Sequence, residues 1–475
     1  PKSGGLNHIT VNGDYVVQNL DARGLKIDRI EGKASLDAGV LKLAPVAATY
    51  NAGRLDAAIS YELSNPRHIF TDVKIDKWPY GTTGGATAAL TAATKLDIDL
   101  EHKGASGPLS ATVDLQYHNA PLSHVDLVAN LQGRMLAVQK IAGNLLSGTF
   151  DGAATVDIDK PLLGHGRVQW DNVDASALAA ITPALEGLGG KFRGTIAMGP
   201  ARDPRPLEPL RIDVNIGADD GHFRGVRIGS PRDIVAMHAV AYANLDRAVL
   251  DHCDLNVADG VVHLWMRAGK GLVSQAAQIS FENLQLDELA HIDPDRTTPM
   301  PGLVSGNFAF VGSGLNTDRL LGKGKIDLTQ TDLGNWGPIA ALYNVMNGGG
   351  SQQPSGVGSL ALRFEQNTLR VTDFRFFNRG IDAFGVFTVG PSVWDLQHAP
   401  VSGQVVGSIR TLKNTRIPLL ADFDEIFSIV QGSLTAIDIG GTKQNPTYVQ
   451  AGVAAIGNDL RTLIVGSARS ENGAQ

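Results

Sequence analysis

The sequence is poor in cysteine, in charged residues and in long apolar runs, and each shortage excludes a structural feature or a class of partner. Cys253 is the only cysteine, so no intrachain disulfide can form. No apolar run reaches the roughly 20 residues that a membrane-spanning helix needs, and no signal peptide is visible. Charged residues make up only 19% of the chain, the net charge is -7, and no long basic run occurs. Because binding to phosphate backbones needs clustered Lys and Arg, nucleic acid is a poor partner for this chain.

Apolar residues and turn-forming residues are abundant instead. Hydrophobic residues make up 43% of the 475 residues, which is enough for a large buried or half-buried surface. The 55 glycines and 22 prolines recur along the whole chain, as expected where many short strands need many turns. The length fits either about two to four compact domains or one elongated sheet built by serial addition of hairpins.

Alternation of apolar and polar residues with a period of two dominates the sequence and gives each segment one apolar face. Turn signals separate these segments, for example at 37–39, 259–260, 322–324 and 365–367. The spacing predicts a mainly β fold of about 24–28 strands, with more than ~45% strand and almost all pairs antiparallel. The expected architecture is a long curved antiparallel β-sheet folded into an open apolar groove, with a few short α-helices.

Helical periodicity is confined to four segments, at 175–188, 338–346, 418–430 and 453–465. Helix should therefore stay below ~20% of the chain. The final stretch, Ser467–Gln475, is small and polar and is expected to fray.

No group of residues has the spacing of a catalytic, cofactor or metal site. His252 and Cys253 are neighbours in an expected strand, so their side chains point to opposite faces, and His263 completes no ligand pattern. The paired carboxylates at 293–295 flank a proline in what reads as a solvated turn. The stretch 322–325 lacks the spacing of a phosphate-binding loop. We therefore expect a protein that is not an enzyme and that holds no cofactor or metal.

Five phenylalanines toward the end of the chain allow two interpretations: Phe374, Phe376, Phe377, Phe384 and Phe387. They fit a plain core between two strands, and they equally fit the lining of a wide apolar groove. Core and groove faces obey the same alternation, so the sequence leaves both interpretations open.

The order of motifs along the chain resembles the AsmA-like family. Pro418–Leu434, "PLLADFDEIFSIVQGSL", precedes "IDIGGT" at Ile437–Thr442 and Asn445-Pro446, and together they are similar to the family's C-terminal ending. Gly302–Leu333 and Leu146–Val173 resemble its recurring phrase of a Gly-rich strand, a second strand and a short apolar helix. Residues 11–60 are similar to a further common module, so the resemblance covers most of the chain from about residue 10 to 465.

The resemblance implies a curled β-sheet that forms an apolar groove and moves phospholipid across the bacterial envelope. It implies a periplasmic location, contact with the inner or outer membrane, and an N-terminal membrane anchor. This chain shows no such anchor and opens with Pro1 rather than Met, so we expect that a segment carrying it has been removed. Three parts are expected: the N-terminal part of the groove (1–200), its continuation with short helices (201–415), and a helix-strand-helix cap (416–475).

Physical reasoning leads to a groove independently of the resemblance. A strand with one apolar face must cover that face, yet few helices are available. A sheet folded over itself, lined partly by Ala and Gly, leaves room for acyl chains, each buried CH₂ contributing roughly 0.8 kcal/mol. The candidate groove residues are Leu96, Ile98, Leu100, Ile212, Val214, Ile216, Ile279, Phe281, Leu362 and Phe364.

Two other functions stay open at this point. A structural or assembly factor would use the same sheet to engage outer-membrane proteins by edge pairing. An extracellular β-rich protein would bind glycans through exposed polar and aromatic ridges.

Overall fold

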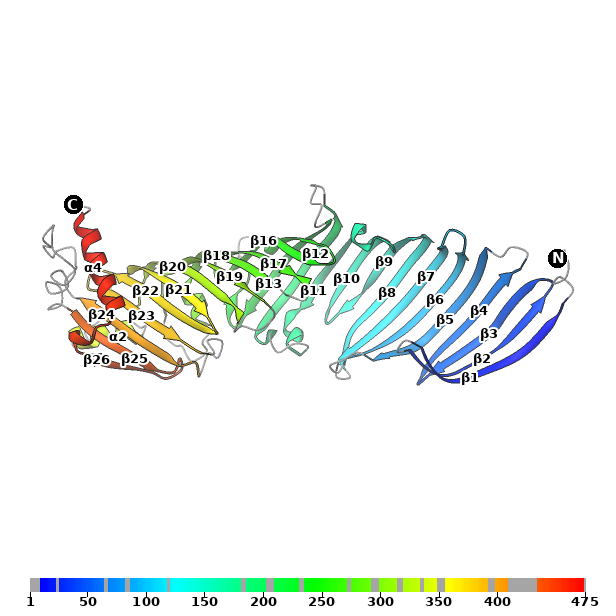
Figure 1. Cartoon of the computed structure of the whole chain (residues 1–475), viewed down its shortest axis with the longest axis horizontal. Helices are drawn as coiled ribbons and strands as arrows, with labels where there is room; N and C mark the ends of the chain where they lie inside the picture. The colour runs from blue at the N-terminus through cyan, green and yellow to red at the C-terminus, as the bar shows by residue number, and fades with distance from the viewer. Residues whose placement is uncertain are drawn as a thin grey trace. The chain divides into compact units, whose positions relative to one another are not determined.

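The computed structural model describes residues 9–473 except 23–24, 64–66, 82–85, 118–119, 181–184, 202–208, 230–234, 271–274, 292–298, 314–318, 334–336, 348–354, 392–397 and 409–433. Within the described residues the chain forms 26 β-strands, which take up 74% of the structure, and a few short helices (Figure 1). The strands belong to one antiparallel sheet that is open rather than closed on itself. The expected mainly β fold, its antiparallel pairing and its number of strands are therefore confirmed.

Strands that follow one another in the sequence pair side by side, as in β1–β2, β2–β3 and β3–β4. The strands are β1 (Val11–Ala22), β2 (Leu25–Asp37), β3 (Val40–Tyr50), β4 (Gly53–Glu62), β5 (His68–Gly81), β6 (Ala86–Asp99), β7 (Gly104–Tyr117), β8 (Ala120–Gly133), β9 (Met135–Leu145), β10 (Gly148–Asp157), β11 (His165–Asp174), β12 (Leu188–Pro200), β13 (Leu210–Phe223), β14 (Val226–Arg227), β15 (Val235–Ala243), β16 (Arg247–Val257), β17 (Gly260–Gly269), β18 (Gln275–Gln285), β19 (Leu303–Gly312), β20 (Leu321–Thr331), β21 (Gly356–Glu365), β22 (Thr368–Phe377), β23 (Asp382–Val389), β24 (Val401–Ser408), β25 (Leu434–Gly441) and β26 (Pro446–Ala451).

Three of the expected turns are hairpin turns between paired strands. Ala38 and Gly39 both have positive φ angles, at 49° and 78°, and join β2 to β3. Residues 258–259 join β16 to β17, and residues 366–367 join β21 to β22, again with positive φ at both positions. Two successive positive φ angles are the geometry of the tight turn whose twist matches that of paired strands.

The fourth expected turn, at 322–324, is wrong, because these residues lie inside β20. Gly322 and Gly324 stand beside large rings of the neighbouring strand: a Cβ on Gly322 would lie 2.6 Å from Phe310, and one on Gly324 would lie 2.5 Å from Phe308. The glycines make room for these rings, and the sequence pattern alone does not distinguish that role from a turn.

The helices match the sequence pattern in part. Helix α2 (Gly337–Asn347) lies where a helix was expected, and residues 175–188 begin with a 3-10 helix, η3 (Ala175–Ala180). The expected helix at 453–465 divides into the 3-10 helix η8 (Val453–Ala455) and α4 (Asn458–Gly473). Helix α4 continues to Gly473, so most of the stretch expected to fray is helical, and 474–475 lie outside the described residues. The segment at 418–430 lies outside the described residues.

Two further short helices carried no helical pattern long enough to predict them. These are α1 (Leu286–Ala290), which has five residues, and the 3-10 helix η2 (Pro161–Leu163), which has three. Among the described residues no helix is both long and apolar enough to cross a membrane.

The chain divides into two compact units. The first unit holds Pro1–Gly221 with Tyr242–Asn244, and the second holds His222–Ala241 with Leu245–Gln475. The three parts expected from the sequence stay a prediction.

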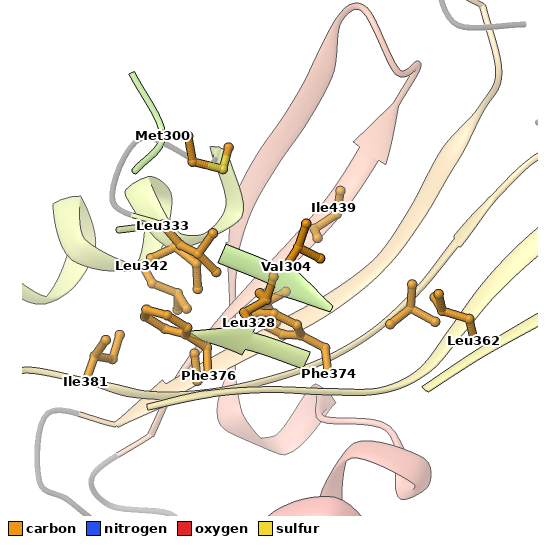
Figure 2. Packing of buried hydrophobic residues seen from close by; sticks show 14 of the residues in the cluster. Met300, Val304, Leu328, Leu333, Leu342, Leu362, Phe374, Phe376, Ile381 and Ile439 are labelled. Atoms are coloured by element: carbon orange, nitrogen blue, oxygen red, sulfur yellow. The ribbon is translucent and has the colours of Figure 1, made fainter. Parts of the chain in front are cut away.

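The main hydrophobic cores lie in the second unit, one on each face of its last strands. The first core packs α2 against strand residues such as Phe374, Phe376 and Ile437. Figure 2 shows part of it, including Leu333, Leu342 and Phe376. The second core packs Leu460 and Ile464 of α4 against Phe384, Val406 and Ala436. These three strand residues pair with one another across β23, β24 and β25. Each is the sequence neighbour of a residue in the first core, and neighbouring residues of a strand point to opposite faces. Helices α2 and α4 therefore cover opposite faces of the sheet.

Candidate functional site

One face of the first unit is apolar across twelve neighbouring strands. The register of the strand pairs from β1 to β12 aligns one residue of each strand in a row, and every member of this row is apolar. This first apolar row consists of Val17, Ile30, Ala48, Leu55, Ile75, Ala92, Ala111, Leu127, Ile141, Gly152, Val168 and Ile196. Because side chains alternate along a strand, residues two positions away share this face.

The opposite face of the same strands carries charged residues among apolar ones. The row one residue along consists of Val16, Glu31, Ala47, Asp56, Lys74, Ala93, Ser110, Val128 and Lys140. Ion pairs neutralise much of this face, for example between Arg54 and Asp56 at 2.8 Å. We call the face with the charged residues the wetted face of the first unit, and the face of the first apolar row its apolar face.

Among the described residues every α-helix belongs to the second unit, and the first unit holds the 3-10 helices η2 and η3. Within the first apolar row only Ala48 is buried, at 4% exposure, while Val17 is 43% exposed and the other members lie between these extremes. A half-exposed apolar face of this extent is unusual for a soluble chain and is a signature of a binding surface.

The second unit carries an equivalent row across ten strands, from β16 to β25. The registers of the strand pairs again align one apolar residue per strand. This second apolar row consists of Leu255, Val262, Phe281, Gly306, Ile326, Leu360, Phe374, Gly385, Val405 and Ile437.

Helix α2 covers only part of this second face. Ile339 and Leu342 of α2 have no exposed surface and pack in the same core as Phe374. Phe281 and Ile326, on strands nearer the start of the row, stay half-buried. The face is therefore closed over its last strands and more open over its first ones.

An apolar hollow of about 220 Å³ lies on the open part of this face, lined by Met266, Ala277, Phe310, Gly312 and Leu320 among others. Its walls continue into a series of phenylalanine rings. The ring centroids of Phe308 and Phe310 are 6.0 Å apart, and Phe310 lies 6.0 Å from Phe364 in an edge-to-face contact. The hollow is large enough for part of an acyl chain.

The candidate groove residues fall into three groups. Leu96 and Ile98 lie half-buried on the apolar face of β6, but Leu100 lies beyond the end of β6, in a turn, and is 46% exposed. Leu100 is therefore not part of that face. In β13, Ile212, Val214 and Ile216 are half-buried and alternate with Arg211 and Asp213, which form an ion pair of 2.8 Å.

The third group lies in the second unit. Ile279 and Leu362 share one register row, next to the row of Phe281, so all three lie on the same face as Phe364. Leu362 and Phe364 are only 5% exposed, whereas Ile279 and Phe281 are half-buried. These four residues thus lie on one face of the sheet, two covered and two half-buried, and their place in a groove stays a prediction.

Sequence reasoning missed Phe308 and Phe310 of β19, which sit at the centre of the phenylalanine series. The stretch 303–312 does not alternate cleanly, because Phe308–Val311 is a continuous apolar run. Their partner glycines in β20 were read as a turn, which hid the pairing.

The five C-terminal phenylalanines lie in the two hydrophobic cores of the second unit, on both faces of its last strands. Phe374, Phe376 and Phe384 are at most 1% exposed. Phe374 and Phe376 lie under α2, whereas Phe377 and Phe384 meet edge-to-face at 5.7 Å beside α4. The core interpretation holds for these residues.

The residues that were weighed for chemistry stand apart from one another. Cys253 is paired with Leu264 on the apolar face, and burial, together with Asp254, raises the pKa of its thiol. His263 contacts the Asp254 carboxylate at 2.7 Å on the other face. The part of the chain that the structure describes holds no group of three or more His, Cys, Asp or Glu side chains placed to bind a metal. Residues 293–295 lie outside the described residues.

No family model, curated protein or solved structure matches the chain. The candidate site therefore consists of two apolar faces: one in the first unit, whose described residues form no α-helix, and one in the second unit that α2 partly covers.

Proposed function

We propose that this protein binds phospholipid by holding the acyl chains against the apolar faces of its sheet, and that it conveys the lipid along these faces in the bacterial envelope. The observation that carries the proposal is the first apolar row, which runs over twelve strands without a charged member, in a unit whose described residues form no α-helix. A single small ligand does not need a face of this length, whereas a path for lipid does.

The energetics favour an acyl chain as the occupant. Each CH₂ moved from water to an apolar surface contributes roughly 0.8 kcal/mol, so a chain of ordinary length offsets the several kcal/mol that association costs. An unbroken apolar row also lets the lipid move sideways without passing a charged group, whose desolvation would raise a barrier. Periplasm, with the inner or outer membrane as source or acceptor of lipid, is the proposed location.

Adjacent residues of β8 give a matched pair of variants that tests this proposal. Leu127 belongs to the first apolar row, and Val128 lies on the opposite face with 42% exposure. Leu127→Asp places a carboxylate in the path of the acyl chains and should sharply reduce lipid recovered with the purified protein. Val128→Asp adds the same charge to the wetted face and should leave lipid content unchanged.

The readout is mass analysis of extracted lipid, with a melting curve for each variant. Equal loss of lipid in both folded variants would contradict the proposal. An equivalent pair in the second unit is Ile279→Asp against Gln278→Asp, since Ile279 is half-buried and Gln278 exposed on adjacent positions of β18.

One observation favours glycan binding as a second function. Phe70 is 45% exposed on the wetted face of β5, stacks against His68 at 6.3 Å, and lines a hollow of about 450 Å³ with Lys95 and Asp72. An aromatic platform among polar side chains suits a sugar ring. Phe70→Ala should abolish binding to a glycan array if this function is real, and should leave lipid content untouched.

A further inference from the structure

On the face of the second unit opposite the second apolar row, three cationic side chains lie in one register row. The register places Lys323 of β20 opposite Arg363 of β21, and Arg363 opposite Arg370 of β22. All three side chains are exposed, and within the described part of the chain none of them forms a hydrogen bond or ion pair. We name Lys323, Arg363 and Arg370 the cationic row.

Other cationic side chains on this face form ion pairs, unlike the three of the cationic row. Two residues along β20, Lys325 pairs with Asp327 at 2.8 Å, and in β22 Arg375 pairs with Asp373 at 2.8 Å. Arg363 has Glu365 two positions away, yet the two form no ion pair. Like charges directly opposite each other in a sheet destabilise it, so the folded protein tolerates a repulsion that a bound anion would relieve.

Exposed apolar side chains surround the cationic row on the same face. Val311 and Leu321 are 55% and 51% exposed, and they occupy the register row next to Lys323. Trp265 of β17 is 36% exposed and lies in the same register row as Lys323, through Gln278 and Ala309. Arg267, also exposed and without a partner in the described residues, lies in the row of Val311.

We infer that the cationic row, together with the exposed apolar side chains around it, docks the protein on an anionic phospholipid bilayer. Basic side chains contact lipid phosphates while exposed aliphatic and tryptophan side chains enter the interfacial layer. The apolar members distinguish a bilayer from a nucleic acid or an acidic peptide, neither of which would need Val311 and Leu321 exposed. The inference rests on the proposed function, because it names the surface at which bound lipid meets its source or acceptor membrane.

Flotation with lipid vesicles tests the inference, using phosphatidylcholine alone and phosphatidylcholine mixed with phosphatidylglycerol. The wild-type chain should bind the mixed vesicles, and binding should fall with salt. Each cation near an anionic surface strengthens binding about five-fold, so Lys323→Gln, Arg363→Gln and Arg370→Gln together should weaken it about a hundred-fold. The melting temperature of this triple variant should not fall, because the substitution removes a repulsion.

Arg375→Gln is the matched control, since it removes the same kind of charge from the same face where the charge is already paired. Arg363→Gln should weaken vesicle binding about five-fold, and Arg375→Gln much less. Equal effects of the two, unchanged binding by the triple variant, or equally strong competition by inorganic phosphate or an oligonucleotide would each overturn the inference.

The outcomes separate this inference from the proposed function. Leu127→Asp should lose copurified lipid and keep vesicle binding, whereas the triple variant should keep copurified lipid and lose vesicle binding. If the triple variant bound vesicles normally while Leu127→Asp lost its lipid, the docking surface would be wrong and the lipid path would stand.

Discussion

At the scale of single residues, Gly324 shows how the sheet makes room for its rings. A Cβ at this position would lie 2.5 Å from a ring carbon of Phe308 and 2.6 Å from the Asn307 carbonyl oxygen. Gly324→Ala should therefore lower the free energy of unfolding by about 1–3 kcal/mol through overpacking. Denaturant titration measures this change.

Gly13 provides the control for that substitution, because a Cβ there would have no neighbour within 4 Å. Gly13→Ala should be neutral, or should stabilise by up to about 1 kcal/mol by restricting the unfolded chain. Similar losses in both variants would show that the crowding around Gly324 is not the cause.

Histidine–aspartate contacts on the wetted face make stability depend on pH. His124 contacts the Asp114 carboxylate at 2.6 Å, and this hydrogen bond raises the pKa of His124 above 6.5. A raised folded-state pKa means that the contribution is fully present below about pH 6.5 and is lost as the pH rises through the raised value. The melting temperature should fall across that window.

Asp114→Asn should flatten this part of the pH profile, because it removes the carboxylate that favours protonated His124. His68 contributes in the same direction through Asp97, so a remaining slope is expected. An unchanged slope in Asp114→Asn, measured by thermal unfolding over the same window, would contradict the assignment.

At the scale of elements, the sequence predicted strands and their faces well and predicted covering poorly. Alternation is a local property of the sequence, so the apolar faces of the strands that contain Ile212 and Leu362 can be predicted without knowledge of the fold. Which face is covered depends on distant segments: Leu362 is buried in the core that α2 helps to form, and Ile212 is not. Short elements such as α1 have too few residues to show a period.

Helix α2 gives a prediction at this scale. Leu342 has no exposed surface and packs into the core of the second unit, whereas Val345, one turn further on, is 41% exposed. Leu342→Ala should cost about 2–5 kcal/mol of stability. Val345→Ala should cost less than about 0.5 kcal/mol, and urea unfolding of the two variants compares them. Equal costs would mean that α2 does not anchor this core.

At the scale of the whole molecule, the two units expose their apolar faces to different degrees. The first unit has a row of twelve apolar residues and only a handful of buried ones, such as Ala48, Trp78 and Val173. Leaving such a face in water costs free energy, and the proposed lipid would supply a layer that covers it. The sequence indicated the amount of apolar surface, but only the register shows that it forms continuous rows.

Lipid extraction from the purified chain, followed by mass analysis, tests the central claim most directly. The account predicts that phospholipid copurifies with the folded protein, survives extensive washing, and is lost in Leu127→Asp but retained in Val128→Asp. Folded wild-type protein with a β-rich spectrum that carries no lipid, and that takes up none from phospholipid vesicles, would contradict it.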